Sequence, residues 1–295
     1  MVYAMPARSL DRPRRSALFM PASNPKAVAK SRSLPADVII FDLEDAVAPD
    51  QKEDARDAAV GALYTGGFGH REVVVRVNGL DTPWGAADLA AVARSGADAV
   101  LVPKVSSPQD ILRYHEALSN APTELQLWTM IETCGAVLRL DAMAALAKST
   151  RLAAWVIGPN DLAKEMRARQ TPDRRAIAPF LSFAVAAARA HGLTILDGVC
   201  NEFRDMDLFR AEAEQGLVLG MDGKTLIHPD QIAPCNAVFS PSEEELAWAG
   251  KIIAAFDAPE AQGKGAIKLD GKMVELLHRD EAQRLVSIAR KIAGR

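Results

Sequence analysis

Residues 38–43, Val38-Ile39-Ile40-Phe41-Asp42-Leu43, give the clearest indication of how this 295-residue chain folds. All but one of these residues are apolar, and the acidic pair Glu44-Asp45 follows directly. A continuous apolar run is typical of a parallel strand that is covered on both faces, whereas a half-exposed strand alternates apolar and polar residues. The stretch therefore predicts a buried parallel strand that ends in acidic side chains.

Comparable runs recur along the chain, and helix-like segments separate them. Eight strand–helix units are typical of a (β/α)₈ TIM barrel, whereas a doubly wound sheet more often has five or six strands and a Gly-rich first turn, which this chain lacks. We therefore expect an α/β fold of the TIM-barrel type. The other seven expected strands are Ser16–Ala22, Glu72–Val77, Ala99–Lys104, Leu125–Ile131, Ala153–Gly158, Thr194–Val199 and Lys224–His228. Four expected helix starts place a capping residue before proline, at Asn24-Pro25, Thr82-Pro83, Ser107-Pro108 and Thr171-Pro172.

The C-terminal part continues beyond a complete barrel. Ser240-Pro241-Ser242-Glu243 predicts a capped helix that flanks the barrel, so we expect a first domain over residues 1–257. Residues 259–271 are rich in Gly and polar residues, which predicts a flexible connection before a helix over about 273–292. Residues 258–295 are thus expected to form a linker and a helical lid.

Composition excludes several classes of protein. Apolar residues make up 49% and charged residues 25% of the chain, as in ordinary globular proteins. The 35 basic and 38 acidic residues nearly balance, which argues against nucleic acid or an anionic membrane as partner. The three cysteines are widely spaced, and no export signal or membrane-spanning segment is evident, so we expect a cytoplasmic protein.

Polar residues stand where the expected strands end, and in a TIM barrel the carboxyl ends of the strands carry the chemistry. Glu132 and Asp161 follow adjacent strands, and two carboxylates with waters and substrate oxygens suit octahedral Mg²⁺. Taken singly, each carboxylate could equally cap a helix or pair with a cation. The full set at the expected mouth is Asp42, Glu44, Asp45, Arg76, Lys104, Glu132, Asp161, Asp197 and His228.

Two basic residues belong to this set. Arg76 lies in the apolar run Val73–Val77, where a guanidinium needs a partner. The partner is either the carboxylate of a substrate or an internal acid, Glu44 or Asp45, and both can hold at once. Lys104 suggests a Schiff base or a structural ion pair, and we favour the ion pair because a metal would already supply the electrophile.

Seven segments, in order, resemble the citrate lyase β-subunit-like CoA ester lyases, which are similar to malyl-CoA lyases and lie within the HpcH/HpaI aldolase group. The resemblance covers nearly the whole chain. The segments are Arg15–Pro21, Asp42–Val47, Arg76–Gly79, Pro103–Val105, Ile131–Thr133, Gly158–Leu162 and Gly223–Pro229.

The resemblance implies a Mg²⁺-binding barrel, commonly a homotrimer and here expected as a trimer or hexamer. Its reaction would be the reversible retro-Claisen cleavage of a 3-hydroxyacyl-CoA, of the malyl-CoA or citryl-CoA type, into a small 2-oxo acid and acetyl-CoA. Carried over by motif, Glu132 and Asp161 match the metal ligands, Glu132 and Arg76 the substrate-binding catalytic residues, and Glu44 with Asp45 the acidic motif near the metal. The segment at Arg15 lies where the family's CoA contacts begin.

One departure concerns the tail. Relatives carry Asp-Gly-Lys-Met-Val-Asp followed by Ala-Pro, and the final aspartate is thought to serve acid/base chemistry in a neighbouring subunit's site. Here the motif ends in Glu275 and lacks the proline, so Glu275 is the matching catalytic candidate, one methylene longer. Two alternatives to the lyase follow: a malyl-CoA-type thioesterase, and a citrate-lyase-complex subunit that depends on a separate acyl carrier protein.

Overall fold

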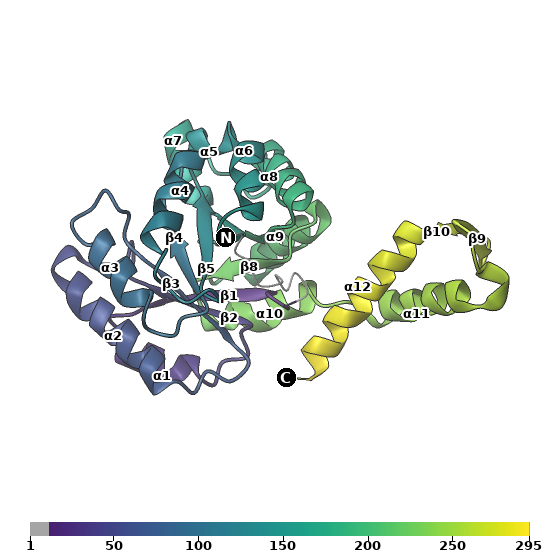
Figure 1. Ribbon diagram of the computed structural model, residues 1–295, viewed down its shortest axis with the longest axis horizontal. Helices are drawn as coiled ribbons and strands as arrows, with labels where there is room; N and C mark the ends of the chain where they lie inside the picture. Colours follow the sequence, from purple (N-terminus) through teal and green to yellow (C-terminus); the bar gives the residue numbers. More distant parts are fainter. Residues whose placement is uncertain (1–11, 295) are drawn as a thin grey trace. The chain divides into compact units, whose positions relative to one another are not determined.

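The computed structural model describes residues 12–294, and its first compact unit, residues 14–239, is a closed barrel of eight parallel strands (Figure 1). The strands pair in chain order and β8 closes the ring against β1. The TIM-barrel prediction is therefore confirmed. The strands are β1 (Ser16–Pro21), β2 (Val38–Asp42), β3 (Glu72–Arg76), β4 (Ala99–Val102), β5 (Gln126–Ile131), β6 (Leu152–Ile157), β7 (Thr194–Asp197) and β8 (Gly223–Leu226).

Alternation along each strand divides the apolar residues between two cores. In β2, Val38 and Ile40 belong to the cluster that fills the barrel, while Ile39 and Phe41 pack in the layer between barrel and helices. Successive strand residues point to opposite faces, so a strand with both faces covered needs apolar side chains at every position. This requirement accounts for the unbroken apolar runs in the sequence.

Helices surround the barrel on its outside (Figure 1). The capping predictions at Asn24 and Ser107 are confirmed, since their side chains accept the backbone N–H groups of Ala27 and Asp110. The α-helices of this unit are α1 (Pro25–Ser31), α2 (Lys52–Thr65), α3 (Gly85–Val92), α4 (Pro108–Ala117), α5 (Cys134–Val137), α6 (Leu140–Ala145), α7 (Pro159–Met166), α8 (Ala178–His191), α9 (Met206–Leu219) and α10 (Ile232–Val238).

Two of the expected helix starts are wrong. Thr82 accepts the N–H of Gly85 and forms a turn, so α3 begins only at Gly85. Thr171 lies in the loop before α8, which begins at Ala178. A capping residue followed by proline occurs at the true and at the false starts, so this dipeptide alone does not separate a helix from a turn.

The second unit comprises residues 240–294 and has its own small core. Its elements are α11 (Glu243–Asp257), β9 (Ala266–Leu269), β10 (Lys272–Glu275) and α12 (Leu276–Ala293). Helix α11 begins two residues later than the predicted capping box implies: the N-cap is Ser242 and not Ser240, and Ser242 and Glu245 bond each other's backbone N–H. Its apolar face, Ala249, Ile252 and Phe256, packs with residues of β10 and α12.

The structure of this unit differs from the expectation in two respects. Residues 266–275 form an antiparallel hairpin: residues 266–271 lie where we expected a flexible connection, and Met273 to Glu275 are strand residues where we expected helix. The hairpin turns at Asp270-Gly271, both at positive φ, the backbone that a two-residue type I′ turn requires. Because α11 shares its core with the hairpin and α12, the unit boundary lies before Ser240, whereas the sequence placed it after residue 257.

No helix within residues 12–294 is both long enough and apolar enough to span a bilayer.

Candidate active site

Every second residue of a strand points into the barrel, and the same alternation brings polar side chains to its mouth. Asp42, Arg76 and Glu132 each lie two positions after an inward-facing residue, as Arg76 does after Val74. Each therefore extends the inward-facing row of its strand by one layer, at the carboxyl end of the barrel. The side chains expected at the mouth from β2, β3 and β5 thus share one face.

Arg76 is the most heavily paired of these residues. Its Nε and Nη2 donate to Asp42 Oδ1 and Oδ2 at 2.7 and 2.5 Å, and Nη1 lies 3.0 Å from Glu44 Oε2 and 3.4 Å from Asp45 Oδ2. Burial would lower the pKa of this guanidinium, but the three carboxylates raise it. Arg76 is therefore a permanent cation, 8% exposed and fixed in direction.

The internal pairing of Arg76 with Glu44 and Asp45, one of the two alternatives, is confirmed. Sequence reasoning missed the strongest partner, Asp42, although the signal was available. Asp42 and Arg76 are the last residues of β2 and β3 and stand side by side in the sheet register. Carboxylate and guanidinium at neighbouring strand ends form a bidentate pair across the sheet.

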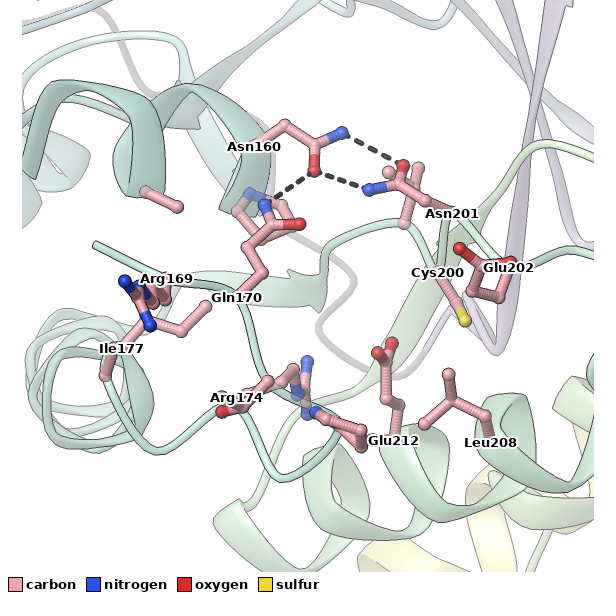
Figure 2. Close-up of a pocket in the computed structure, with 16 residues that line it drawn as sticks. Asn160, Arg169, Gln170, Arg174, Ile177, Cys200, Asn201, Glu202, Leu208 and Glu212 are labelled. Atoms are coloured by element: carbon pink, nitrogen blue, oxygen red, sulfur yellow. Dashed lines mark hydrogen bonds between the residues drawn. The ribbon is translucent and has the colours of Figure 1, made fainter. Parts of the chain in front are cut away.

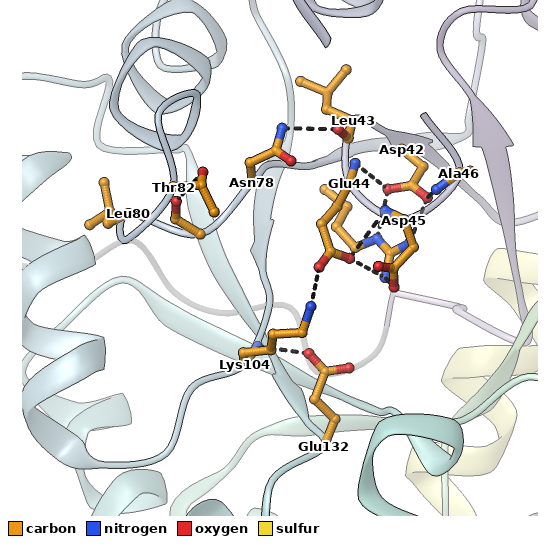
Figure 3. A network of polar contacts seen from close by, with 12 residues as sticks. Asp42, Leu43, Glu44, Asp45, Ala46, Asn78, Leu80, Thr82, Lys104 and Glu132 are labelled. Carbon is orange, nitrogen blue, oxygen red and sulfur yellow. Dashed lines mark hydrogen bonds and ion pairs between the residues drawn. The ribbon is translucent and has the colours of Figure 1, made fainter. Parts of the chain in front are cut away.

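Lys104 links this cluster to Glu132 (Figure 3). Its Nζ donates to Glu44 Oε1 at 2.7 Å, which confirms the predicted structural ion pair. Its backbone adopts a left-handed conformation, φ 52°, and its N–H donates to Glu132 Oε1 at 2.7 Å. A non-glycine residue rarely holds this conformation unless its surroundings impose it, and such residues concentrate at functional sites.

Glu132 is almost completely buried, with 2% of its surface exposed. Burial is the main cause that raises the pKa of its carboxyl to about 7, the Lys104 N–H opposes the shift, and the charges of Asp161 and Glu44 add to it. Gly158 leaves room for this side chain, because a Cβ at that position would overlap the Glu132 carboxylate and its Cβ. A buried carboxyl beside a second carboxylate has an unfavourable charged form until a cation joins it.

Asp161 supplies that second carboxylate from the first turn of α7. Among the described residues, none forms a hydrogen bond or ion pair with its side chain, yet its charge acts on both Glu132 and Lys104. Within residues 12–294 no group of three or more His, Cys, Asp or Glu side chains is arranged to hold a metal. The donor set here is two carboxylates, which fits Mg²⁺ because that ion keeps several waters and takes few protein ligands.

Arg76, Glu132, Asp161 and Asp45 line one cavity of about 300 Å³. The sequence-predicted metal ligands and the predicted substrate arginine therefore face the same space, and Glu44 lies behind them as a partner of Arg76 and Lys104. The carboxylate of Asp42 also lines the cavity, and apolar or neutral groups complete the wall: Phe19, Ala46, Met130, Ile157, Gly158, Pro159, Asn160, Val199, Asn201, Thr225 and Ile227.

Other residues expected at the mouth lie elsewhere or have structural partners. Asp197 is fully buried and pairs with Arg174 and Lys224, so it does not line the cavity. His228 caps a short 3₁₀ turn and stacks on Phe203. Arg15, expected where the family's CoA contacts begin, precedes β1 at the amino end of the barrel and pairs with Asp37, on the side opposite the cavity.

The family of the chain follows from comparison with known proteins. The model of the HpcH/HpaI aldolase/citrate lyase family matches residues 15–229, which span the whole barrel. The chain belongs to this family. The match begins just before β1 and ends just after β8, so the predicted resemblance is confirmed for the part of the chain that forms the cavity.

Relatives of the chain within the family carry more than one activity. The (3S)-malyl-CoA thioesterase of Cereibacter sphaeroides (strain KD131) is 50% identical over 282 residues, covering 96% of each chain. The citrate lyase subunit beta of Escherichia coli (strain K12) is 34% identical over 296 residues, 98% of this chain and 97% of the other. A crystal structure of CitE from Mycobacterium tuberculosis with magnesium, acetoacetate and coenzyme A is 28% identical, with a TM-score of 0.75 over 95% of this chain and 99% of that one.

Glu275, the acid/base candidate, belongs to the second unit of this family member. It stands at the N-terminus of α12, where its backbone N–H donates to His278 Nδ1 and its side chain caps the helix. It is half-buried and follows directly on the hairpin. The carboxylate is thus held at a fixed place in its own unit, and its catalytic role remains a prediction.

Proposed function

We propose that the cavity is the active site of a Mg²⁺-dependent enzyme that acts on the CoA ester of a 3-hydroxy acid of the malyl-CoA type. One observation carries this proposal: a buried carboxyl with a raised pKa, a second carboxylate without a hydrogen-bonding partner among the described residues, and a fixed guanidinium line the same small space. The three carboxylates Asp42, Glu44 and Asp45 already pair with the guanidinium, so the charges of Glu132 and Asp161 are left for a further cation.

In this proposal Glu132 and Asp161 hold the ion. Bound there, Mg²⁺ would act as a Lewis acid on the hydroxyl and carboxylate oxygens of the substrate. Arg76 would bind and orient the substrate carboxylate, and the carboxylates of Asp42 and Glu44 prevent it from turning away. The magnesium in the CitE crystal structure supports this assignment.

The bond that breaks distinguishes two reactions. The relative at 50% identity is a thioesterase, and this favours hydrolysis, in which water adds to the thioester carbonyl and the C–S bond breaks to release CoA and the hydroxy acid. Hydrolysis is therefore the overall reaction that we propose first.

Carbon–carbon cleavage, the activity predicted from the sequence, is the second candidate, and the cavity itself favours it. Cleavage turns the hydroxyl-bearing carbon into the carbonyl of a 2-oxo acid and leaves an acetyl-CoA enolate, so groups that grip the hydroxy acid assist it directly. The hydroxyl gives up its proton as the bond breaks, and the enolate must then gain a proton at carbon, so the reaction consumes no net proton. Glu275 would deliver that proton, from its own or a neighbouring subunit of a homo-oligomer.

Product analysis decides between the two reactions. The purified chain is incubated with (3S)-malyl-CoA and Mg²⁺, and products are identified by liquid chromatography with mass spectrometry. Free CoA with malate indicates hydrolysis, and acetyl-CoA with glyoxylate indicates cleavage. Consumption by the isolated chain also rules out dependence on an acyl carrier partner. The proposal fails if malyl-CoA is untouched, or if EDTA leaves the rate unchanged.

A further inference from the structure

Two lysine side chains, Lys52 and Lys224, are buried in the part of the chain that the structure describes. Lys224 has carboxylate partners, because its Nζ lies 3.0 Å from Asp197 and 3.1 Å from Glu212. Glu212 lines a second cavity, of about 340 Å³, together with Arg174 (Figure 2). Ion pairs therefore account for the burial of Lys224, and the burial of Lys52 needs another explanation.

The side chain of Lys52 is 6% exposed, and its ammonium contacts the backbone of one loop. Its Nζ donates to the carbonyl oxygens of Leu43 and Glu44, at 2.9 and 2.6 Å. The ring of Trp84 lies over the ammonium, with its centroid 5.6 Å from Nζ. Burial of an ammonium costs hydration free energy, so these contacts must compensate for it.

Helix α2 does not account for a lysine at this position. Lys52 is the first residue of the helix, and a positive charge at a helix N-terminus opposes the helix dipole. The next two residues, Glu53 and Asp54, have the charge that the dipole favours. The contribution of Lys52 is therefore to the loop that it contacts and not to α2.

This loop follows β2 and is held from two sides (Figure 3). On one side the backbone N–H groups of Glu44 and Ala46 donate to Asp42 Oδ1 and Oδ2, at 2.9 and 3.1 Å. On the other side the carbonyls of Leu43 and Glu44 accept from Lys52. The loop thus lies between a carboxylate that binds its N–H groups and an ammonium that binds its carbonyls.

The loop carries a carboxylate that joins two cations of the site. Glu44 Oε2 lies 3.0 Å from Arg76 Nη1, and Glu44 Oε1 lies 2.7 Å from Lys104 Nζ. A shift of the Glu44 backbone therefore also moves the carboxylate that fixes the direction of Arg76. Asn78 Nδ2 donates to Leu43 O as well, at 2.9 Å, so loss of Lys52 should loosen the loop without releasing it.

We propose that Lys52 is a positioning residue of the active site, which fixes the backbone of Leu43 and Glu44 so that Glu44 holds Arg76 in the direction that binds the substrate carboxylate. This inference rests on the proposed function, in which Arg76 receives that carboxylate. Arg76 has no part in binding CoA in that function, so Lys52 should act on the acid end of the substrate alone.

Replacing Lys52 with methionine keeps the aliphatic stem and removes the ammonium. In the full chain with Mg²⁺, Lys52→Met should raise KM for malyl-CoA and weaken competitive inhibition by pyruvate, a 2-oxo acid probe, each by about 10-fold or more. Inhibition by free CoA should stay as in the wild type. Lys148→Met removes an exposed lysine at the amino end of β6 and should leave all three quantities unchanged.

A double-mutant cycle tests whether Lys52 acts through Glu44. If it does, adding Lys52→Met to Glu44→Gln should weaken pyruvate inhibition no further, whereas independent effects would multiply. The unfolding midpoint of every variant is measured in EDTA. If Lys52→Met does not unfold cooperatively, Lys52→Gln, which removes the charge but keeps an N–H donor, replaces it in the cycle with the same expected result.

Three results would overturn the inference and leave the proposed function standing. Pyruvate inhibition could stay unchanged while the unfolding midpoint falls, which would make Lys52 purely structural. Inhibition by CoA could weaken as much as inhibition by pyruvate, or the effects of the two substitutions could multiply. If the wild type does not consume malyl-CoA with Mg²⁺, the proposed function fails and the inference fails with it.

Discussion

Replacing Glu132 with glutamine should stabilise the metal-free protein at pH 8 and abolish its stabilisation by Mg²⁺. Glutamine keeps the shape of the side chain and the acceptor for the Lys104 N–H, but it removes the buried charge. In the wild type that charge is the unfavourable form until a cation binds, because burial and the neighbouring acids oppose it. If Glu132 were instead a carboxylate held by an ion pair within the protein, replacing it with glutamine would destabilise the metal-free protein.

The magnitude follows from the pKa. A carboxyl with a pKa of about 7 in the folded protein and 4.5 in the unfolded chain holds a proton in the folded state that the unfolded state has lost. The free energy of unfolding therefore falls as pH rises from 4.5, and the loss is complete above about pH 7. The full loss is about 3 kcal/mol, so Glu132→Gln should gain about 3 kcal/mol at pH 8 and less than about 1 kcal/mol at pH 5.

Thermal unfolding by calorimetry measures this difference. In EDTA at pH 8 the midpoint of Glu132→Gln should exceed that of the wild type by about 6 °C or more, and the gap should close towards pH 5. Added Mg²⁺ should raise the wild-type midpoint and leave that of the variant unchanged. Glu214→Gln, an exposed site on α9, is the matched control and should follow the wild type throughout.

The opposite result is that Glu132→Gln destabilises the metal-free protein at pH 8 by an amount that does not vary with pH, and it would refute a buried, uncompensated charge at Glu132. That result would mean that the Glu132 carboxylate is stabilised by partners within the chain. The negative charge of Glu132 would then already be compensated without Mg²⁺.

Further substitutions test the other parts of the site. Asp161→Asn should abolish Mg²⁺-dependent turnover while the unfolding midpoint in EDTA stays at or above that of the wild type; a large fall would show a structural role. Arg76→Lys keeps the charge but loses the bidentate geometry, and should raise KM for malyl-CoA at least about 10-fold. Gly158→Ala places a methyl group against Glu132 and should weaken Mg²⁺ binding measured by calorimetry, at a cost in stability of about 1–3 kcal/mol. Glu275→Gln should lower kcat for carbon–carbon cleavage by about 10²-fold or more with an unaltered midpoint, and an unchanged kcat would remove the tail carboxylate from the chemistry.

The sequence predicts the barrel well because both faces of each strand are buried. A strand buried on both faces is visible in the sequence as a short apolar run, such as Val73 to Val77. Eight such runs are compatible with few topologies. The ends of the runs also locate Arg76 and Glu132, since the last inward position of a strand is fixed by the period of two.

The sequence does not show which of several nearby charged side chains form ion pairs with one another. Asp42 takes the bidentate position on Arg76 because β2 and β3 pair with those two residues level, which depends on sheet register. Asp197 ends its strand like the others, but it does not line the cavity. Its carboxylate forms ion pairs with Lys224 on the neighbouring strand and with Arg174 in the loop before α8. The Asp270-Gly271 hairpin was readable from its turn dipeptide, and composition alone misassigned it as a flexible connection.

The most direct test is a crystal structure of the protein grown with Mg²⁺ and a 2-oxo acid. We expect one octahedral ion that contacts a carboxylate oxygen of Glu132 and one of Asp161 at about 2.0–2.1 Å, with the acid's carboxylate facing Arg76. An ion held by other carboxylates would contradict this assignment of the metal ligands. So would a cavity without an ion in crystals grown at a saturating Mg²⁺ concentration.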